Sequence, residues 1–407
     1  MNRTRLLTFT LLWLIPPASA QQPGPRARDL GIPLDGDTGP LNAITDVPGV
    51  AVGHVTLIRG TGKLRVGSGP VRTGVTAIFP RGQKDLAPVF AGWFSLNGNG
   101  EMTGIPWIED YGQMLYPVTL TNTNSVGTVR DAVIEWGRPR IPGVFNCCLP
   151  VATETWDGDL NDIYGFHIKK EHAFAAFDSA KSGPVAEGNV GGGTGMQCLG
   201  FKGGIGTASR RLSPRSGGFT VGVLVQCNFG SRRQLRIAGI PVGREIDDLD
   251  PCYVGILPLP DPQAKRCPGG SPAQREQGSI IVVIATDAPL LPNQLRRVAR
   301  RAALGIGRMG GVAGAGSGDL FLAFSTASTG AADTARITSV RMLQDQRIDP
   351  IYEATVQATE EAIINALLAA KTMTGANDLR VAGLPHDRLR TILQKYNRLE
   401  KPQANQE

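Results

Sequence analysis

Short apolar runs separated by glycine-rich turns recur along most of the chain. Such runs, rich in valine, isoleucine and threonine, predict β-strands. The predicted strands cover residues 50–57, 75–79, 118–121, 219–226, 279–286 and 321–324. Helical spacing of apolar residues predicts helices at 125–136, 294–304 and 352–373, with a last one after His386. Ser125 is expected to cap the first of them, and the mixture predicts packed layers of α and β structure.

The run at residues 279–286 (SIIVVIAT) differs from the others because it is apolar almost throughout. Continuous apolar runs are typical of strands buried on both faces of a sheet. The preceding residues 259–277 are rich in proline, glycine and charge, and we expect them to form an exposed, mobile connection. A break between Gly278 and Ser279 would therefore leave a new amine beside the core.

Residues 1–20 have the pattern of a secretory signal peptide. Arg3 and Arg5 precede an apolar run at 6–15, and the small residues 18–20 (ASA) form a cleavage site. The run is shorter than the ~20 residues that span a bilayer, although an uncleaved anchor is the alternative. The sequence predicts a periplasmic or secreted protein with no membrane association once the signal is removed.

Composition and charge exclude some classes of function. Hydrophobic residues make up 41% of the 407-residue chain, enough for the core of one large domain or two intimate ones. The net charge is +7, and the most basic cluster, residues 296–301, lies on a predicted helix without aromatic residues between its arginines. That pattern favours a solvated helix face over a nucleic-acid site, so no nucleic-acid partner is expected.

The cysteine pattern allows disulfides but does not choose among them. The six cysteines are at positions 147, 148, 198, 227, 252 and 267. Export permits disulfides, and Cys252–Cys267 would close a plausible loop, whereas the adjacent Cys147 and Cys148 cannot easily pair with each other. The other connectivities stay open. Neither a CxxC motif nor a metal-ligand spacing of histidines occurs, so no metal site is expected.

Ser279 is the best candidate nucleophile. A serine hydroxyl needs a base, and no histidine lies in a suggestive context; Ser317 lacks the GxSxG pattern of a nucleophile elbow. The GxGxxG match at 305–310 follows a predicted helix and indicates a helix-ending glycine loop instead of a dinucleotide site. An α-amine, with a pKa of ~7.7–8.0, can serve an N-terminal serine as its base. Attack of the Ser279 hydroxyl on the uncrowded Gly278 carbonyl would create that amine.

The segment 278–292 (GSIIVVIATDAPLLP) resembles the cleavage site of the DmpA-type aminopeptidases, the group of L-aminopeptidase/D-amino-acid esterases and β-aminopeptidases. The likeness extends over nearly the whole chain after the signal. Further matching segments lie at 121–127, 154–158, 187–195, 201–206, 225–230 and 316–319.

The resemblance implies a four-layer α/β/β/α sandwich of the DmpA/ornithine acetyltransferase type. Residues 21–278 and 279–407 would be the α- and β-subunit parts of a single catalytic domain, and members assemble as homotetramers of such heterodimers. The implied activity is a self-processing serine aminopeptidase that releases N-terminal L-, D- or β-residues from short peptides, amides or esters through an acyl-enzyme. The substrate needs a free N-terminal amine, and the resemblance implies that no metal or organic cofactor is needed.

The resemblance also assigns roles to individual residues. Ser279 would be the nucleophile of both autocleavage, at Gly278, and catalysis. Ser317 would relay its proton, Asp319 would orient the network, and Asn228 would bind the oxyanion. The substrate-binding pair would be Glu154, which anchors the ammonium group, and Trp156. Some members carry Glu where this chain has Asp319, and Tyr where it has Trp156.

Simpler interpretations exist for the same residues. Ser317 and Asp319 are also typical of a glycine turn, and Asn228 of a strand end. Glu154 and Asp157 could be surface carboxylates around a tryptophan in the core. Two other functions stay open: an acyltransferase of the ornithine acetyltransferase type, in which the new N-terminal residue is usually threonine, and an uncut, non-catalytic exported binding protein.

Overall fold

The computed structural model describes residues 24–140, 149–255, 258–260, 264–267, 278–327, 329–333 and 335–400. The predicted signal peptide, Cys147, Cys148 and most of the predicted connection at 259–277 lie outside the described residues. Within these ranges, no helix combines the length and the apolar character needed to cross a membrane.

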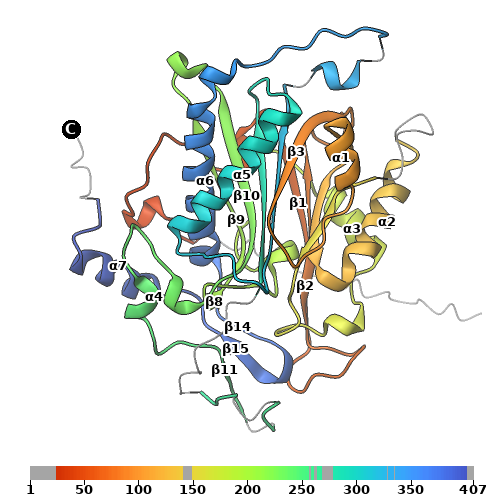
Figure 1. Cartoon of the computed structure of the whole chain (residues 1–407). Helices are drawn as coiled ribbons and strands as arrows, with labels where there is room; N and C mark the ends of the chain where they lie inside the picture. The colour runs from red at the N-terminus through yellow and green to blue at the C-terminus, as the bar shows by residue number, and fades with distance from the viewer. Residues whose placement is uncertain are drawn as a thin grey trace, which may run out of the picture.

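Two β-sheets pack face to face in the centre of the molecule (Figure 1). The first has the order β1 (Ala51–Arg59), β2 (Val71–Phe79), β5 (Val118–Asn122), β6 (Ala152–Thr155). The second has the order β4 (Gln113–Met114), β3 (Val89–Gly98), β13 (Gly318–Ser325), β12 (Ser279–Thr286), β10 (Thr220–Asn228), β9 (Gly204–Arg211). Ile78 and Leu120 of the first sheet share one apolar cluster with Ile281 and Val283 of the second.

Helices cover the outer face of each sheet. The helices α2 (Val126–Gly137) and α3 (Lys170–Asp178) pack on the first sheet, and α5 (Pro292–Arg308) and α6 (Asp349–Ala369) pack on the second, as Figure 1 shows. The predicted four-layer α/β/β/α sandwich is therefore confirmed. The peripheral elements are α1 (Ile105–Tyr111), α4 (Val242–Glu245), α7 (His386–Lys395), the small sheet of β11 (Cys252–Tyr253), β15 (Leu379–Val381) and β14 (Met373–Thr374), and the hairpin β7 (Gln197–Cys198) and β8 (Phe201–Lys202).

Strand β12 lies in the interior of its sheet, antiparallel to β10 on one edge and parallel to β13 on the other. All of its residues are buried. Ile280, Val282 and Ile284 face the cluster that includes α5 and α6, whereas Ile281 and Val283 face the core between the sheets. The prediction of a strand buried on both faces, with these bounds, is confirmed.

Three local predictions were wrong. The helix expected over 352–373 ends at Ala369, because Ala370 is extended and Met373 pairs in β14. Ser125 makes no capping hydrogen bond and lies in a 3₁₀ turn instead. Helix α5 continues through Gly305 and Gly307 before it ends, so residues 305–308 are not a loop. At Gly305 a β-carbon would crowd Thr359, so the glycine lets α5 and α6 approach closely.

Two disulfides form among the described cysteines. Cys198–Cys227 ties the β7–β8 hairpin to β10, with Cα atoms 5.5 Å apart. Cys252–Cys267 closes the loop that the sequence allowed.

The packing of α6 on β9 generates a stability prediction. A β-carbon on Gly206 would overlap the backbone oxygen of Ala362 in α6. We expect Gly206→Ala to lower the free energy of unfolding by about 1–3 kcal/mol, the usual cost of overpacking, measured by chemical denaturation. Gly127→Ala is the control, since this glycine is exposed in α2 with open space around its Cα; it should be neutral or gain up to ~1 kcal/mol. Equal stability of the two variants would contradict the packing argument.

Candidate active site

The sheet register brings three polar residues to one edge of the second sheet. Asn228 at the end of β10 pairs with Ser279 at the start of β12. Asp319, near the start of β13, pairs with Ile280. Because β10 is antiparallel to β12 and β13 is parallel to it, the C-terminal end of β10 lies beside the N-terminal ends of β12 and β13. All three side chains are buried.

The Ser279 hydroxyl lies beside a paired serine and aspartate. Its Oγ accepts a hydrogen bond from the backbone N–H of Gly318 at 3.0 Å. Ser317 Oγ donates to Asp319 Oδ1 at 2.6 Å, and the same oxygen accepts from the Ile280 N–H at 3.2 Å. The segment 317–319 therefore does more than turn the chain: it contacts the hydroxyl and the strand that carries it.

Two glycines allow this close approach. Gly278 has φ +104°, and a β-carbon there would overlap the backbone oxygen of Asn228. At Gly318 a β-carbon would overlap the backbone oxygen of Asn99. The peptide before Ser279 and the N–H that binds its hydroxyl thus both need a residue without a side chain.

The Asn228 carboxamide is held at both of its polar atoms. Its Oδ1 accepts from the Gln197 N–H at 2.7 Å, and its Nδ2 donates to the Trp156 carbonyl at 2.9 Å. An amide NH₂ has a second hydrogen, so this carboxamide, whose residue pairs with Ser279, can make one more donation. This arrangement is more specific than that of a simple strand end.

Glu154 is a buried carboxylate from the first sheet, 3% exposed. Its Oε1 accepts from the Glu101 N–H at 2.9 Å, and its Oε2 accepts from the Thr123 hydroxyl. Burial raises the pKa of Glu154 above its ordinary value, against the lowering effect of these two hydrogen bonds. Among the described residues, no lysine or arginine forms an ion pair with it. Such a carboxylate can bind a cation that comes from outside.

The interpretation of Glu154 and Asp157 as surface groups around a core tryptophan was wrong. Trp156 is the exposed member at 38%, with its ring edge-on to Tyr164 at 6.5 Å. Asp157 is buried and accepts from Asn161 Nδ2 at 2.9 Å. Strand β6 ends at Thr155, so Trp156 and Asp157 no longer follow the alternation of inward and outward side chains along the strand.

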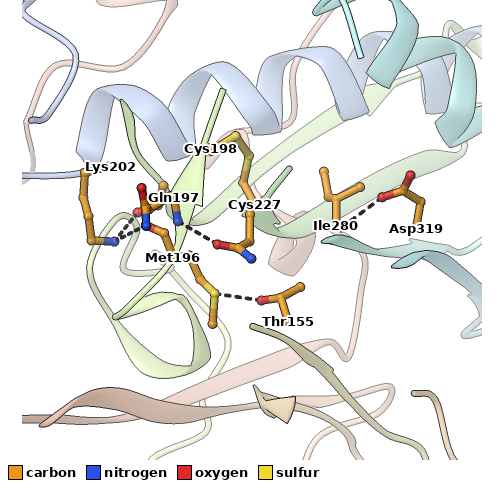
Figure 2. Close-up of a disulfide and its surroundings, with 10 residues drawn as sticks. Thr155, Met196, Gln197, Cys198, Lys202, Cys227, Ile280 and Asp319 are labelled. Carbon is orange, nitrogen blue, oxygen red and sulfur yellow. Dashed lines mark hydrogen bonds between the residues drawn. A yellow bond between two sulfur atoms is a disulfide. The ribbon is translucent and has the colours of Figure 1, made fainter. Parts of the chain in front are cut away.

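Two buried groups near the site were missed by sequence reasoning. Lys202 is fully buried, and its Nζ donates to the carbonyls of Met196 at 2.7 Å and Gly203 at 2.8 Å (Figure 2). Burial lowers the pKa of Lys202 to about 7. The second group is the backbone N–H of Gln197, which donates to Asn228 and which no sequence pattern predicts. The one available signal was a lysine flanked by Phe201 and glycines, where a charge has no obvious access to solvent.

The four histidines of the chain all have partners elsewhere. His54 contacts Thr76, and His167 contacts Asp162. His172 accepts from the N–H of Lys169, and His386 contacts the carbonyl of Leu368. The hydroxyl of Ser279 is therefore not paired with an imidazole.

A serine that heads a central strand of a four-layer sandwich, beside a fixed carboxamide and without a histidine, defines a hydrolase of the N-terminal-nucleophile class. A match to the model of peptidase family S58 covers residues 42–381. The chain belongs to this family and is a serine aminopeptidase.

Similar proteins agree with this assignment. Beta-peptidyl aminopeptidase BapA of Sphingosinicella microcystinivorans is 54% identical over 383 residues, 94% of this chain and 95% of that one. The solved L-aminopeptidase D-Ala-esterase/amidase of Ochrobactrum anthropi, described as a variant of the Ntn hydrolase fold, has a TM-score of 0.82 at 46% identity and covers 92% of this chain and 100% of its own. A Burkholderia beta-aminopeptidase gives 0.80 at 46% identity, with 91% and 98% covered.

Asp157 generates a prediction about pH. Burial raises the pKa of Asp157 from 3.8 to about 7. Between these values the folded protein keeps a proton that the unfolded chain has lost, so this residue makes stability fall as pH rises. Asp157→Asn has no such group and should gain stability relative to wild type from pH 4 to 7, by ~1 kcal/mol or more.

Chemical denaturation at several pH values measures this difference. Asp178→Asn, at the exposed end of α3, serves as the control and should track wild type. A difference between Asp157→Asn and wild type that stays constant across the window would contradict the buried, protonated carboxyl.

Proposed function

We propose that the chain is an exported, self-processing serine aminopeptidase that hydrolyses N-terminal residues from short peptides, amides or esters through an acyl-enzyme on Ser279. The observation that carries the proposal is the register that places Asn228 and Asp319 on either side of Ser279 at the head of β12. A single chain break before Ser279 would supply the missing base, its own α-amine.

Autocleavage begins with attack of Ser279 Oγ on the Gly278 carbonyl carbon. The C–N bond breaks, the nitrogen takes up the proton that the hydroxyl loses, and an ester joins the two pieces. Water then hydrolyses the ester, which leaves a glycine carboxylate and a free amine on Ser279. The positive φ of Gly278 and the lack of space beside it support a peptide held in one conformation for this attack.

Catalysis repeats the same chemistry on a substrate. Ser279 Oγ attacks the carbonyl carbon of the substrate's N-terminal residue, while the α-amine of Ser279 takes the hydroxyl proton, assisted by the Ser317–Asp319 pair. The carbonyl electrons move to oxygen, where Asn228 Nδ2 donates to the oxyanion. Collapse expels the amine leaving group with a proton, and water hydrolyses the acyl-enzyme. The hydrogen bond between Ser317 and Asp319, and that from the Gly318 N–H to Ser279, support these roles.

Glu154 binds the ammonium group of the substrate, and Trp156 lines the entrance. The support is a buried carboxylate without a cation of its own among the described residues, next to an exposed indole. Two similar proteins, from Sphingosinicella species, are named beta-peptidyl aminopeptidases, at 54% and 49% identity. We therefore place N-terminal β-residues first among the substrates to be tested.

Processing, export and assembly belong to the same proposal. Residues 1–20 would be removed on export to the periplasm or the medium. The two fragments, 21–278 and 279–407, would stay together because β12 is buried between β10 and β13. Such heterodimers would assemble into a homotetramer. Serine at 279 argues against an acyltransferase of the ornithine acetyltransferase type, and an added amine acceptor that does not divert the product would exclude it.

Intact mass of the purified protein tests self-processing. Wild type should yield a fragment of residues 279–407, and Ser279→Ala should remain one chain, because the substitution removes the attacking Oγ. Ser68→Ala, in an exposed turn, is the control and should be cut like wild type. A folded wild-type chain that stays uncut would remove the proposed nucleophile.

Steady-state kinetics of Glu154→Gln test the ammonium site. For a substrate with a free N-terminal amine, KM should rise roughly 30-fold or more, equivalent to about 2 kcal/mol, with kcat changed little. Glu101→Gln, an exposed neighbour, should have a small effect. An N-acetylated substrate should be poor with every variant. Loss of kcat at constant KM would instead assign Glu154 to the chemical step.

A further inference from the structure

Lys202 is joined to Asn228 through a single peptide plane. Its Nζ donates to the carbonyl of Met196, and the N–H of the next residue, Gln197, donates to Asn228 Oδ1. The carbonyl and the N–H of one trans peptide point in opposite directions. A donor that fixes the Met196 oxygen therefore also fixes the direction of the Gln197 N–H.

We propose that Lys202 is a positioning residue for catalysis, which holds the Met196–Gln197 peptide so that the Asn228 carboxamide points its free N–H at the oxyanion. The proposal rests on the oxyanion role of Asn228 under the proposed function. Lys202 itself does not contact the substrate; it acts through the peptide and the carboxamide.

The surroundings of the Met196–Gln197 peptide show how closely it is held. Lys202 Nζ also donates to Gly203 at 2.8 Å, and more distantly to Gly193 at 3.4 Å, so one ammonium group draws three carbonyls together. The Cys198–Cys227 disulfide joins the neighbours of Gln197 and Asn228, and Figure 2 shows it beside the Lys202 network. Thr155 Oγ1 contacts Met196 Sδ from the other side at 2.8 Å.

The cost of burying Lys202 indicates a role beyond packing. A buried ammonium group is unfavourable unless it is hydrogen-bonded, and burial lowers the pKa of Lys202 to about 7. A methionine of similar length would fill the same volume without this cost. Aligned hydrogen bonds also polarise one another, so the Lys202 donor at the start of this hydrogen-bond chain strengthens donation by the carboxamide at its end.

A double-mutant cycle with Lys202→Met and Asn228→Ala tests the proposal. Asn228→Ala should lower kcat by roughly 10²–10³-fold, as for other oxyanion donors. Lys202→Met should lower kcat by about 10–10²-fold at unchanged KM, the effect expected of a misplaced catalytic group. The double variant should match Asn228→Ala within about threefold, since Lys202 has nothing left to position. Lys202→Gln, which keeps an N–H donor, should recover part of the loss.

Arg210→Met is the matched control. Arg210 is another buried cation that donates to backbone carbonyls, those of Asp35 and Ser209, and it also forms an ion pair with Glu361, but it lies at the far end of β9. Its removal should lower thermal stability and leave kcat per folded molecule unchanged. If variants at 202 or 228 slow autocleavage, the rate of fragment release replaces kcat in the same cycle, because attack on Gly278 also forms an oxyanion.

The outcomes separate the two proposals. The positioning role would be overturned if Lys202→Met lowered kcat by the same factor in the wild-type and Asn228→Ala backgrounds. It would also be overturned if Lys202→Met kept full kcat. Full kcat in Asn228→Ala would overturn the oxyanion role of the proposed function, whatever Lys202→Met does. If Lys202→Met does not fold, Lys202→Gln replaces it in the double-mutant cycle, and the same two outcomes would overturn the positioning role.

Discussion

The pairing of β12 with β10 and β13 determines the rest of the site. Backbone hydrogen bonds along both edges of β12 fix its register, and side chains on both of its faces are buried in separate cores. A slip of one residue would exchange the two faces. The positions of Asn228, Ser279 and Asp319 relative to one another are therefore as rigid as the core, although all three lie where strands begin or end.

The sequence predicted the parts of this arrangement that have local signals. An all-apolar run after a polar, proline-rich segment identified β12 and the serine at its head. The role proposed for each polar residue came from the resemblance to the DmpA-type family and not from spacing alone. The structure adds that these residues lie together.

The remainder could not be predicted because it depends on contacts between distant backbone groups. The N–H of Gln197 is the same in any residue except proline, so its bond to Asn228 leaves no trace in the sequence. Lys202 and Asp157 look like surface residues by type, and only the folded chain shows them buried. The end of α6 was missed for a similar reason, since Met373 leaves the helical pattern to pair with Val381.

The site draws its groups from both sheets: Glu154 comes from β6 in the first and Ser279 from β12 in the second. Under the proposed function, one sheet anchors the ammonium of the substrate and the other attacks its carbonyl. The side chains packed between the sheets then set the distance between the ammonium site and the nucleophile. This distance determines the length of substrate backbone that fits between the two groups. One extra methylene distinguishes a β- from an α-amino acid, and residues such as Ile281 and Leu120, which pack between the sheets, would decide whether the site accommodates it.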